Sequence, residues 1–252
     1  MILTSKGGIP MKSISRSLFL LFLCVMPTLT PLALADEPVP TGAPSNTVKA
    51  KAASDTATQD PGQAEAKKYT DAIQAYYDAA QTYSAAFTQD YVTVDGIKKE
   101  SSGIVWFKKP GMMRWDYEKP EARFLISDGK NFWSWEPVYR QYCRQDLSSS
   151  QLPTALTFLS GQGRIEDDFN VAVEKIDGSR VYLRLTPKHP SLAYARIDFE
   201  ILMPTAKVYR VKIYDSMGNT NRITFKSPEI NASLDASSFQ FNPPADATHI
   251  CE

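Results

Sequence analysis

Few residues of this sequence have side chains that catalyse reactions, and their spacing matches no catalytic motif. The 252 residues include two histidines, His189 in TPKHP and His249 close to the C-terminus. The sequence has no Gly-x-Ser-x-Gly elbow and no glycine-rich phosphate loop. The acidic run 166–168 could supply carboxylates for acid–base chemistry, but adjacent acids before Phe169 are more typical of a solvated helix end. We therefore expect a protein that is not an enzyme.

The cysteines allow a disulfide. Cys143 lies in mid-chain, within RQYCRQDL, and Cys251 is the penultimate residue. In an oxidising compartment the two could pair and tie down the C-terminal tail, or they could remain two free thiols. No recognised ligand spacing surrounds them, so we expect no metal site.

The first 35 residues have the character of a secretory signal peptide. From Met11, the expected start, MKSISRS carries two positive charges and leads into an apolar run that ends in the small-x-small site ALA at 33–35. Cys24 lies inside this run and not after a small residue at its end, so we expect no lipid on it. Residues 36–64 are rich in Pro, Ala, Thr, Ser and Gly and predict a disordered tether. The pattern predicts an exported protein.

Positive and negative charges are balanced, with 28 Lys plus Arg and 28 Asp plus Glu. Neither sign gathers in long blocks, so we expect neither nucleic acid nor an anionic membrane as a partner. The composition calls for no cofactor, and a monomer is expected.

Residues 65–252 have the pattern of one folded domain. From Glu65 to Phe87, large apolar side chains recur at intervals of three and four, which predicts an amphipathic helix. Its apolar residues are Ile73, Tyr76, Ala80, Tyr83 and Phe87.

Period-two alternation follows and predicts an antiparallel sheet. In RIDFEIL, residues 196–202, Ile197, Phe199 and Ile201 fall on one face. In YRVKIYD, residues 209–215, the alternation places Tyr209, Val211 and Ile213 together. VYLRL (181–185) and RITF (222–225) continue the pattern, and turn signals separate these segments.

A second helix is expected over residues 148–163, where serines and a proline precede an apolar run that ends on glycines. The order of elements is then a helix, several strands, a short helical segment and several more strands. We expect an α+β fold in which one large curved sheet has a face covered by helices.

In the stretch KKPGMMRWDYEKP, residues 108–120, large apolar side chains are flanked on both sides by charged ones. All four tryptophans of the chain lie between residues 106 and 135. Such a group can be the core of the sheet, and it also suits a pocket for a flexible apolar ligand.

These residues carry a resemblance to a known family. GIVWFKKPGMMRWDYEKPEARFLISDGKNFWSWEP resembles the central motif of LolA, the periplasmic outer-membrane lipoprotein carrier. The motif has a strand ending in a basic pair and proline, a tryptophan, a second proline, and a hydrophobic triplet before Ser-Asp-Gly-Lys. SAAFTQ (84–89), expected at the end of the first helix, and SSFQFNPPADA (237–247) agree with the same family. The resemblance spans residues 70–247.

The resemblance implies an incomplete antiparallel β-barrel with an α-helical lid over an apolar cavity. It implies that the protein accepts acylated lipoproteins from an inner-membrane ABC transporter and delivers them to an outer-membrane receptor. A lipid-sensing or lipoprotein-binding module of the same fold, which does not transfer cargo, is the alternative. No second folded domain is visible in the sequence, which favours the carrier.

The resemblance also suggests roles for single residues. The arginine with which the family latches its lid falls on Lys109, which could instead be a solvated surface lysine; lysine lacks the planar fork of arginine, so any latch would differ. We expect the acyl-binding side chains to be Val105, Phe107, Met113, Trp115, Leu125 and Trp133 from the sheet, with Leu156 and Phe158 from the lid. A one-residue error in register would reverse the face of any of these strand residues.

Overall fold

The computed structural model describes residues 61–146, 163–191 and 193–251. The expected signal peptide, most of the expected tether and nearly all of the helix expected over 148–163 therefore lie outside the described residues. The elements are α1 (Pro61–Asp78), β1 (Thr82–Val92), β2 (Lys98–Lys108), β3 (Met112–Lys119), β4 (Arg123–Asp128), β5 (Asn131–Glu136), β6 (Gln141–Asp146), α3 (Ile165–Asp168), β7 (Phe169–Asp177), β8 (Arg180–Pro187), β9 (Arg196–Leu202), β10 (Lys207–Tyr214), β11 (Thr220–Ile230), η2 (Ala236–Phe239) and β12 (Thr248–His249).

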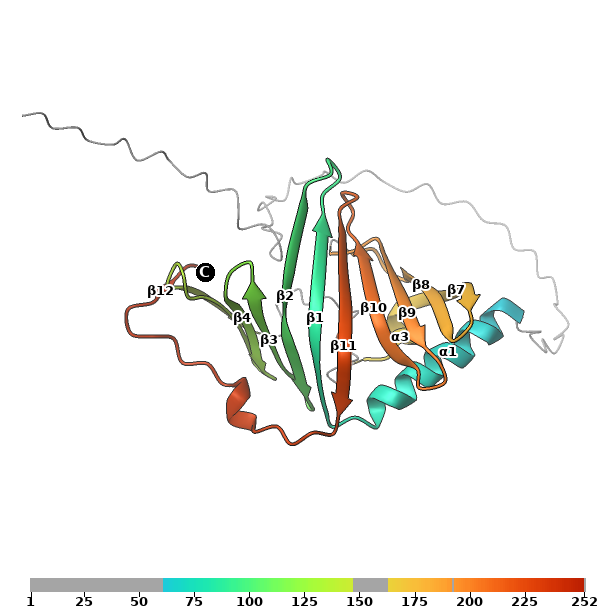
Figure 1. The fold of residues 1–252 in the computed structure, drawn as a ribbon, viewed down its shortest axis with the longest axis horizontal. Helices are drawn as coiled ribbons and strands as arrows, with labels where there is room; N and C mark the ends of the chain where they lie inside the picture. The colour runs from blue at the N-terminus through green and yellow to red at the C-terminus, as the bar shows by residue number, and fades with distance from the viewer. Residues whose placement is uncertain (1–60, 147–162, 192, 252) are drawn as a thin grey trace, which may run out of the picture. The chain divides into compact units, whose positions relative to one another are not determined.

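The described strands form one 12-stranded sheet in the order β12-β6-β5-β4-β3-β2-β1-β11-β10-β9-β8-β7 (Figure 1). Strands β1 to β6 form one antiparallel meander and β7 to β11 form another. The two meanders join where β1 pairs antiparallel with β11. The sheet is curved and unclosed, with β7 and β12 at its edges. This confirms the predicted α+β fold with an incomplete antiparallel barrel.

Helix α1 is amphipathic and packs on the sheet. Its buried side chains include Ala66, Tyr69, Ile73 and Tyr77, which recur at the three- and four-residue spacing of one helix face. This face contacts β7 and β10. We call the face of the sheet that α1 covers the inner face, and the opposite one the outer face.

The predicted extent of this helix is wrong at its C-terminal end. The helix begins at Pro61 and ends at Asp78, so Tyr83, Phe87 and the whole of SAAFTQ lie on β1. On that strand Tyr83, Ala85 and Phe87 are buried while Ala86 is exposed. The four-residue spacing of Tyr83 and Phe87 is compatible with a helix, but it is also twice the period of a strand.

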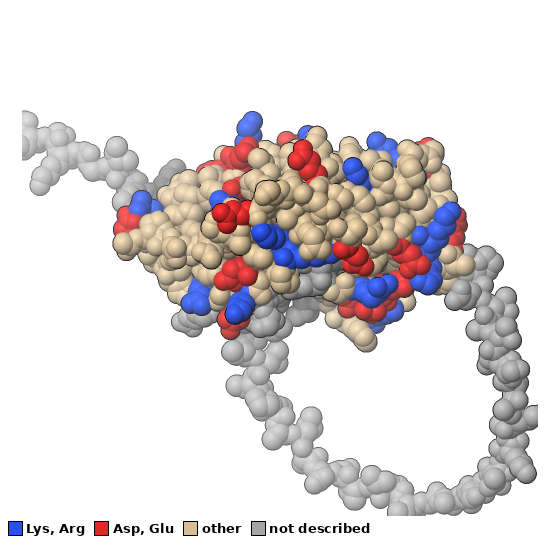
Figure 2. Space-filling view, turned by 90° about the horizontal axis from the view of Figure 1, so that it is seen from below, with Lys and Arg blue, Asp and Glu red and all other residues tan. Residues whose placement is uncertain are grey.

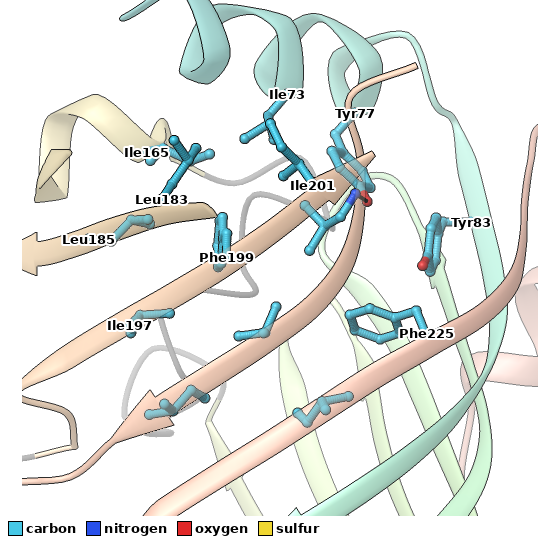
Figure 3. Close-up of a cluster of buried hydrophobic side chains, with 14 of the residues drawn as sticks. Ile73, Tyr77, Tyr83, Ile165, Leu183, Leu185, Ile197, Phe199, Ile201 and Phe225 are labelled. Atoms are coloured by element: carbon cyan, nitrogen blue, oxygen red, sulfur yellow. Dashed lines mark hydrogen bonds between the residues drawn. The ribbon is translucent and has the colours of Figure 1, made fainter. Parts of the chain in front are cut away.

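Apolar side chains from α1 and from both meanders form one core on the inner face. Figure 3 shows Ile73 and Tyr77 pointing from α1 toward side chains of β8, β9 and β11. In β9, Ile197, Phe199 and Ile201 are all buried here, as their alternation predicts.

In β10 the predicted alternation is wrong at Tyr209. The pairing with β9 shifts between Val208 and Arg210, a β-bulge that gives the buried position to Val208. Tyr209 is left only partly buried, with the guanidinium groups of Arg180 and Arg210 over its ring at 4.9 and 5.2 Å. Both arginines also form salt bridges with Glu200, which is buried.

The C-terminal segment, residues 231–251, covers part of the outer face, and we call it the strap. It runs from the end of β11 past β3 and β4 to β12, which pairs parallel with β6 (Figure 1). Phe239 of η2 is 0% exposed. The Arg114 Nη1 group donates a hydrogen bond to the Ser238 carbonyl at 2.9 Å, and the rings of Trp135 and Phe241 lie 5.8 Å apart. The strap thus gives the outer face of the aromatic meander its own small core.

The surface carries both signs of charge side by side. On the face shown in Figure 2, acidic and basic side chains alternate and do not form separate patches. None of the helices in the described parts of the chain is long and apolar enough to span a membrane.

Replacing Phe239 with alanine should therefore destabilise the protein by about 3–5 kcal/mol, because it removes the buried anchor of the strap. Urea unfolding followed by circular dichroism measures this change. Phe241→Ala is the matched control, since Phe241 is only partly buried, and should cost about 1 kcal/mol. Equal effects of the two substitutions would contradict the assignment of Phe239 as the anchor.

Candidate functional site

Five of the side chains predicted to bind acyl chains lie together on the inner face. Val105, Trp115 and Leu125 stand in one row across β2, β3 and β4, because Val105 pairs with Trp115 and Trp115 with Leu125. Phe107 and Met113 form the adjacent pair. All five are buried and belong to the same apolar cluster as the core under α1.

Aromatic rings surround Trp115 on this face. Its ring centroid lies 4.9 Å from that of Phe87, 6.1 Å from Phe107, 6.3 Å from Phe225 and 6.5 Å from Tyr117. Phe87, Tyr117 and Phe225 come from β1, β3 and β11, and the predicted acyl-binding set does not include them. The alternation of SAAFTQ could have indicated Phe87, had the segment been taken as a strand.

Gly103 allows β2 and β3 to come together beside these rings. A Cβ atom on Gly103 would lie 1.9 Å from the backbone oxygen of Asp116, a distance no side chain tolerates. The pairing also shifts between Ser102 and Gly103. Glycine at this position is therefore a requirement of the strand pairing.

Trp133, predicted for the site, lies on the face of the sheet opposite to the other five side chains. Leu125 pairs with Ser134, so on β5 the residues that share its face are Ser134 and Phe132. Trp133 pairs with Ile126 on the outer face, and both are buried outside the inner cluster. Phe132 takes the place expected for Trp133, since it belongs to the inner cluster.

The cover expected over this part of the sheet is not described. Leu156 and Phe158, the two predicted lid side chains, lie outside the described residues. The cover that the structure does describe is α1, over β7 and β10.

Lys109 binds the end of α1. Its Nζ atom donates hydrogen bonds to the carbonyl oxygens of Tyr77 at 2.8 Å and Asp78 at 3.0 Å, and its backbone N–H donates to the Gln81 carbonyl at 3.0 Å. The last carbonyls of a helix have no partner within the helix, and a cation beside them is favourable. A lysine in this position can therefore hold α1 on the sheet without the fork of an arginine.

Asn231, at the start of the strap, forms hydrogen bonds with the segment that joins α1 to β1. Its Oδ1 accepts a hydrogen bond from the Gln81 N–H at 2.8 Å, and its own N–H donates to the Thr82 carbonyl at 2.9 Å. The Thr82 hydroxyl donates to the Ala232 carbonyl at 2.7 Å. The turn between α1 and β1 is thus fixed by residues far away in the sequence.

The acidic run 166–168 takes part in positioning the helix. It forms most of the short helix α3, whose Ile165 is buried in the inner core. Glu166 accepts a hydrogen bond from the Thr70 hydroxyl at 2.7 Å and lies 3.6 Å from the Lys67 ammonium group. Its interactions with α1 give this carboxylate a structural explanation.

The two turns of the family-like motif contact each other. The Ser127 hydroxyl donates to the Gly111 carbonyl at 3.3 Å, and it accepts from the Gly129 N–H at 3.1 Å. Gly129 has φ of 91° and packs against the Pro110 carbonyl. The Pro-Gly turn after β2 and the Ser-Asp-Gly turn after β4 therefore hold the β2–β5 strands in place from the same end.

Asp128 closes the second turn. Its carboxylate accepts hydrogen bonds from the N–H groups of Lys130 at 2.8 Å and Asn131 at 2.7 Å, and from the Asn131 side chain at 3.0 Å. Burial acts to raise the pKa of Asp128, but these donors together hold the pKa below its ordinary value.

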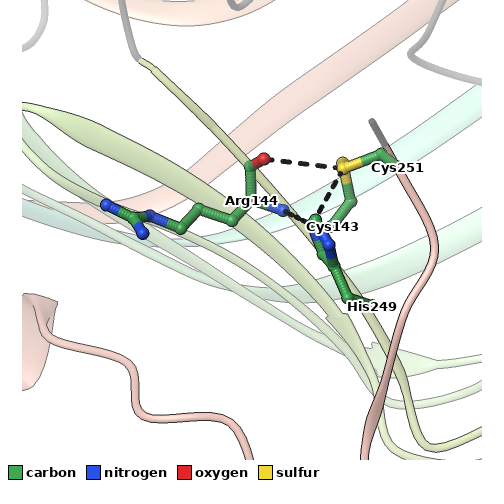
Figure 4. Close-up of a disulfide and its surroundings, with 4 residues drawn as sticks. All are labelled: Cys143, Arg144, His249 and Cys251. Carbon is green, nitrogen blue, oxygen red and sulfur yellow. Dashed lines mark hydrogen bonds between the residues drawn. A yellow bond between two sulfur atoms is a disulfide. The ribbon is translucent and has the colours of Figure 1, made fainter.

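Cys143 and Cys251 form a disulfide with their Cα atoms 5.2 Å apart (Figure 4). It joins β6 to the end of the strap, and His249 lies beside it with Nε2 3.6 Å from the Cys251 sulfur. Among residues 61–146, 163–191 and 193–251 there is no group of three or more His, Cys, Asp and Glu side chains placed to hold a metal ion.

Together the fold and the site define a half-barrel protein with a continuous apolar, aromatic inner face. Comparison with known proteins finds relatives that belong to one family. The family model "Outer membrane lipoprotein carrier protein LolA" matches residues 78–242. The outer-membrane lipoprotein carrier protein of Methylibium petroleiphilum is 30% identical over 185 residues, which cover 72% of this chain and 89% of that protein. That of Methylococcus capsulatus is 29% identical over 176 residues, covering 69% and 83%.

The chain therefore belongs to the LolA family. Among solved structures, an uncharacterized conserved protein from Thermus thermophilus has a similar fold, with a TM-score of 0.50 at 13% identity. The similarity covers 74% of this chain and 98% of that protein.

Lys109→Met should loosen the end of α1 and destabilise the protein by about 1–2 kcal/mol, because it removes charge-assisted hydrogen bonds to two helix carbonyls. Hydrogen exchange should speed up in the last turn of α1 before other helical amides. Lys109→Arg should retain most of the protection. Lys99→Met, an exposed change on β2, the strand that leads to Lys109, is the control; if it matches Lys109→Met, the latch assignment fails.

Asp128→Asn should lower stability at neutral pH and have little effect in acid. A carboxyl whose pKa is lowered by folding stabilises the protein above its unfolded pKa of about 3.9, and this contribution disappears as the pH falls through the folded pKa. Urea unfolding at pH 7 and near pH 3 measures the difference. Glu118→Gln, exposed on β3, should change stability little at either pH. An unchanged Asp128→Asn difference at both pH values would refute the charge contribution.

Proposed function

We propose that this protein is a periplasmic carrier that binds the acyl chains of lipoproteins on its inner face. One observation carries the proposal: a buried row of apolar side chains crosses strands β2 to β4, formed by Val105, Trp115 and Leu125. The chain that contains this row belongs to the family of outer-membrane lipoprotein carriers. The proposal assigns the protein no catalysed reaction.

The physics of acyl chains makes such a carrier necessary. Burying one methylene group is worth roughly 0.8 kcal/mol. Moving a chain of about 15 methylenes from an apolar environment into water therefore costs on the order of 10 kcal/mol. A protein that crosses an aqueous space with this cargo must offer apolar side chains in exchange. It must also release the cargo, so the empty protein has to regain stability when its inner face closes on itself.

The contacts of α1 suggest where opening and closing are controlled. Lys109 binds the carbonyls of Tyr77 and Asp78, at the junction of α1 with the sheet. These hydrogen bonds are at the partly exposed end of the helix and can exchange with water at little cost. We assign Lys109 the role of the latch that holds α1 on the inner face.

The remaining parts of the proposal concern the route of the cargo. Residues 1–35 act as a signal peptide that directs the chain to the periplasm, where a disulfide such as Cys143–Cys251 is stable. Residues 36–64 form a tether, apart from the residues already in α1, and the folded carrier domain extends to residue 252 as a monomer. Its partners are an inner-membrane ABC transporter that loads it and an outer-membrane receptor that unloads it.

The full chain, expressed in a bacterial periplasm and purified, should carry triacylated lipoproteins that mass spectrometry identifies. These should pass to membranes that bear the receptor. Cargo that binds but never transfers would identify a lipid-sensing or lipoprotein-binding module of the same fold. A protein that is empty and takes up no fluorescent acyl probe would refute the proposal.

A pair of variants tests which face binds. Met113→Gln puts a polar group on the inner face and should weaken acyl-probe binding by about tenfold. Ile104→Gln makes the matched change on the outer face of the neighbouring strand and should leave binding unchanged. Thermal unfolding verifies that both variants fold, and equal affinities would contradict the inner-face site.

A further inference from the structure

Tyr83 places a polar group in the middle of the apolar inner face. It lies on β1 and is 1% exposed. Its ring centroid lies 5.9 Å from those of Tyr77 and Phe107 and 6.2 Å from that of Phe225. Figure 3 shows its hydroxyl pointing toward Phe225, into the cluster.

The Tyr83 hydroxyl is buried and has no hydrogen-bond partner among the described residues. Tyr77, its neighbour, shows the usual arrangement, because its hydroxyl accepts a hydrogen bond from the Val208 N–H at 3.2 Å. A buried hydroxyl without a partner lowers stability, so such groups are rare in folded proteins and call for an explanation. A phenylalanine would fill the same space without this cost.

The hydroxyl remains a hydrogen-bond donor at any pH the protein meets. Burial raises the pKa of Tyr83 far above its ordinary value, and the phenols of Tyr77 and Tyr76 raise it further. In the protonated form the hydroxyl can donate to an uncharged or anionic acceptor. A carboxylate would also need a cation nearby, whereas a carbonyl oxygen needs only the donor.

The acyl chains of a lipid bring such an acceptor with them. Each chain is joined to its head group through an ester or amide carbonyl, which loses its hydrogen bonds to water when it enters an apolar site. A binding face built only of hydrocarbon would leave that carbonyl unsatisfied. The ligand would then contain an acceptor without a partner, the acyl carbonyl, and the protein a donor without a partner, the Tyr83 hydroxyl.

We propose that the Tyr83 hydroxyl donates a hydrogen bond to the ester carbonyl of an acylglyceryl group bound on the inner face. This inference rests on the proposed carrier function and adds the part of the cargo that is recognised. It makes Tyr83 a specificity-determining residue, which favours acyl esters over hydrocarbon of equal length. The preference follows because a site with a buried donor rejects ligands that cannot satisfy it.

Two lipids that differ only in their carbonyls provide the test. Dipalmitoylglycerol has ester carbonyls and di-O-hexadecylglycerol has ether linkages on chains of equal length. Competition with a fluorescent acyl probe should show that the wild type prefers the ester. Tyr83→Phe should weaken binding of the ester by about three- to tenfold and leave the ether unchanged. Tyr182→Phe, which removes a phenol hydroxyl from the partly exposed side of β8, should keep the wild-type preference.

The stability of the lipid-free protein gives a second, independent measurement. Tyr83→Phe removes an unsatisfied buried hydroxyl and should raise the Tm. A lowered Tm would show that the hydroxyl has a partner within the protein and would overturn the inference. Equal losses for ester and ether, or no loss for either, would overturn it while leaving the carrier function intact. A wild type that binds neither lipid would overturn both.

The ester can come from a lipoprotein or from a phospholipid. A synthetic dipalmitoylglyceryl-cysteine peptide and dipalmitoyl phosphatidylethanolamine carry the same ester carbonyls on different head groups. If Tyr83→Phe weakens both by the same factor, recognition resides in the ester, as proposed. A loss confined to one of them would place the hydroxyl at a head group and overturn the assignment.

Discussion

Val105, Trp115 and Leu125 stand side by side on neighbouring strands, and the burial of rows like this one fixes the register of the whole sheet. A shift of one residue in any strand would turn its apolar side chains to the other face. The inner face therefore determines both the stability of the fold and the identity of the proposed binding surface. The strap gives the other face of the aromatic meander its own anchor, Phe239, so that both faces of these strands resist slipping.

Much of the fold was predictable because its signals are local. Alternation places Ile197, Phe199 and Ile201 on one face without reference to the rest of the chain. The end of α1 was not predictable in this way, since no glycine or proline marks it. It is fixed by Lys109, in the turn after β2, and by Asn231, at the start of the strap, both distant from it in sequence. Local pattern alone could therefore not place Tyr83 on a strand.

The differences between the predicted and observed strand faces have a similar origin. On β5 both Phe132 and Trp133 are large and aromatic, so composition does not choose between them, and only the pairing of Leu125 with Ser134 decides. On β10 a bulge exchanges Tyr209 for Val208. Such details decide which side chains meet a ligand, because non-directional apolar contacts set affinity while one well-placed polar group can set selectivity.

The pairing of β1 with β11 has a consequence for the life of the chain before it is folded. These strands are distant in sequence, yet their pairing joins the two meanders into one sheet. A partly synthesised chain in which β11 has not yet been made, as far as Ile230, cannot complete that sheet. Long-range pairing of this kind also forms slowly. The disulfide between Cys143 and Cys251, 108 residues apart, likewise can form only after both segments have been made, so it closes the sheet edge late.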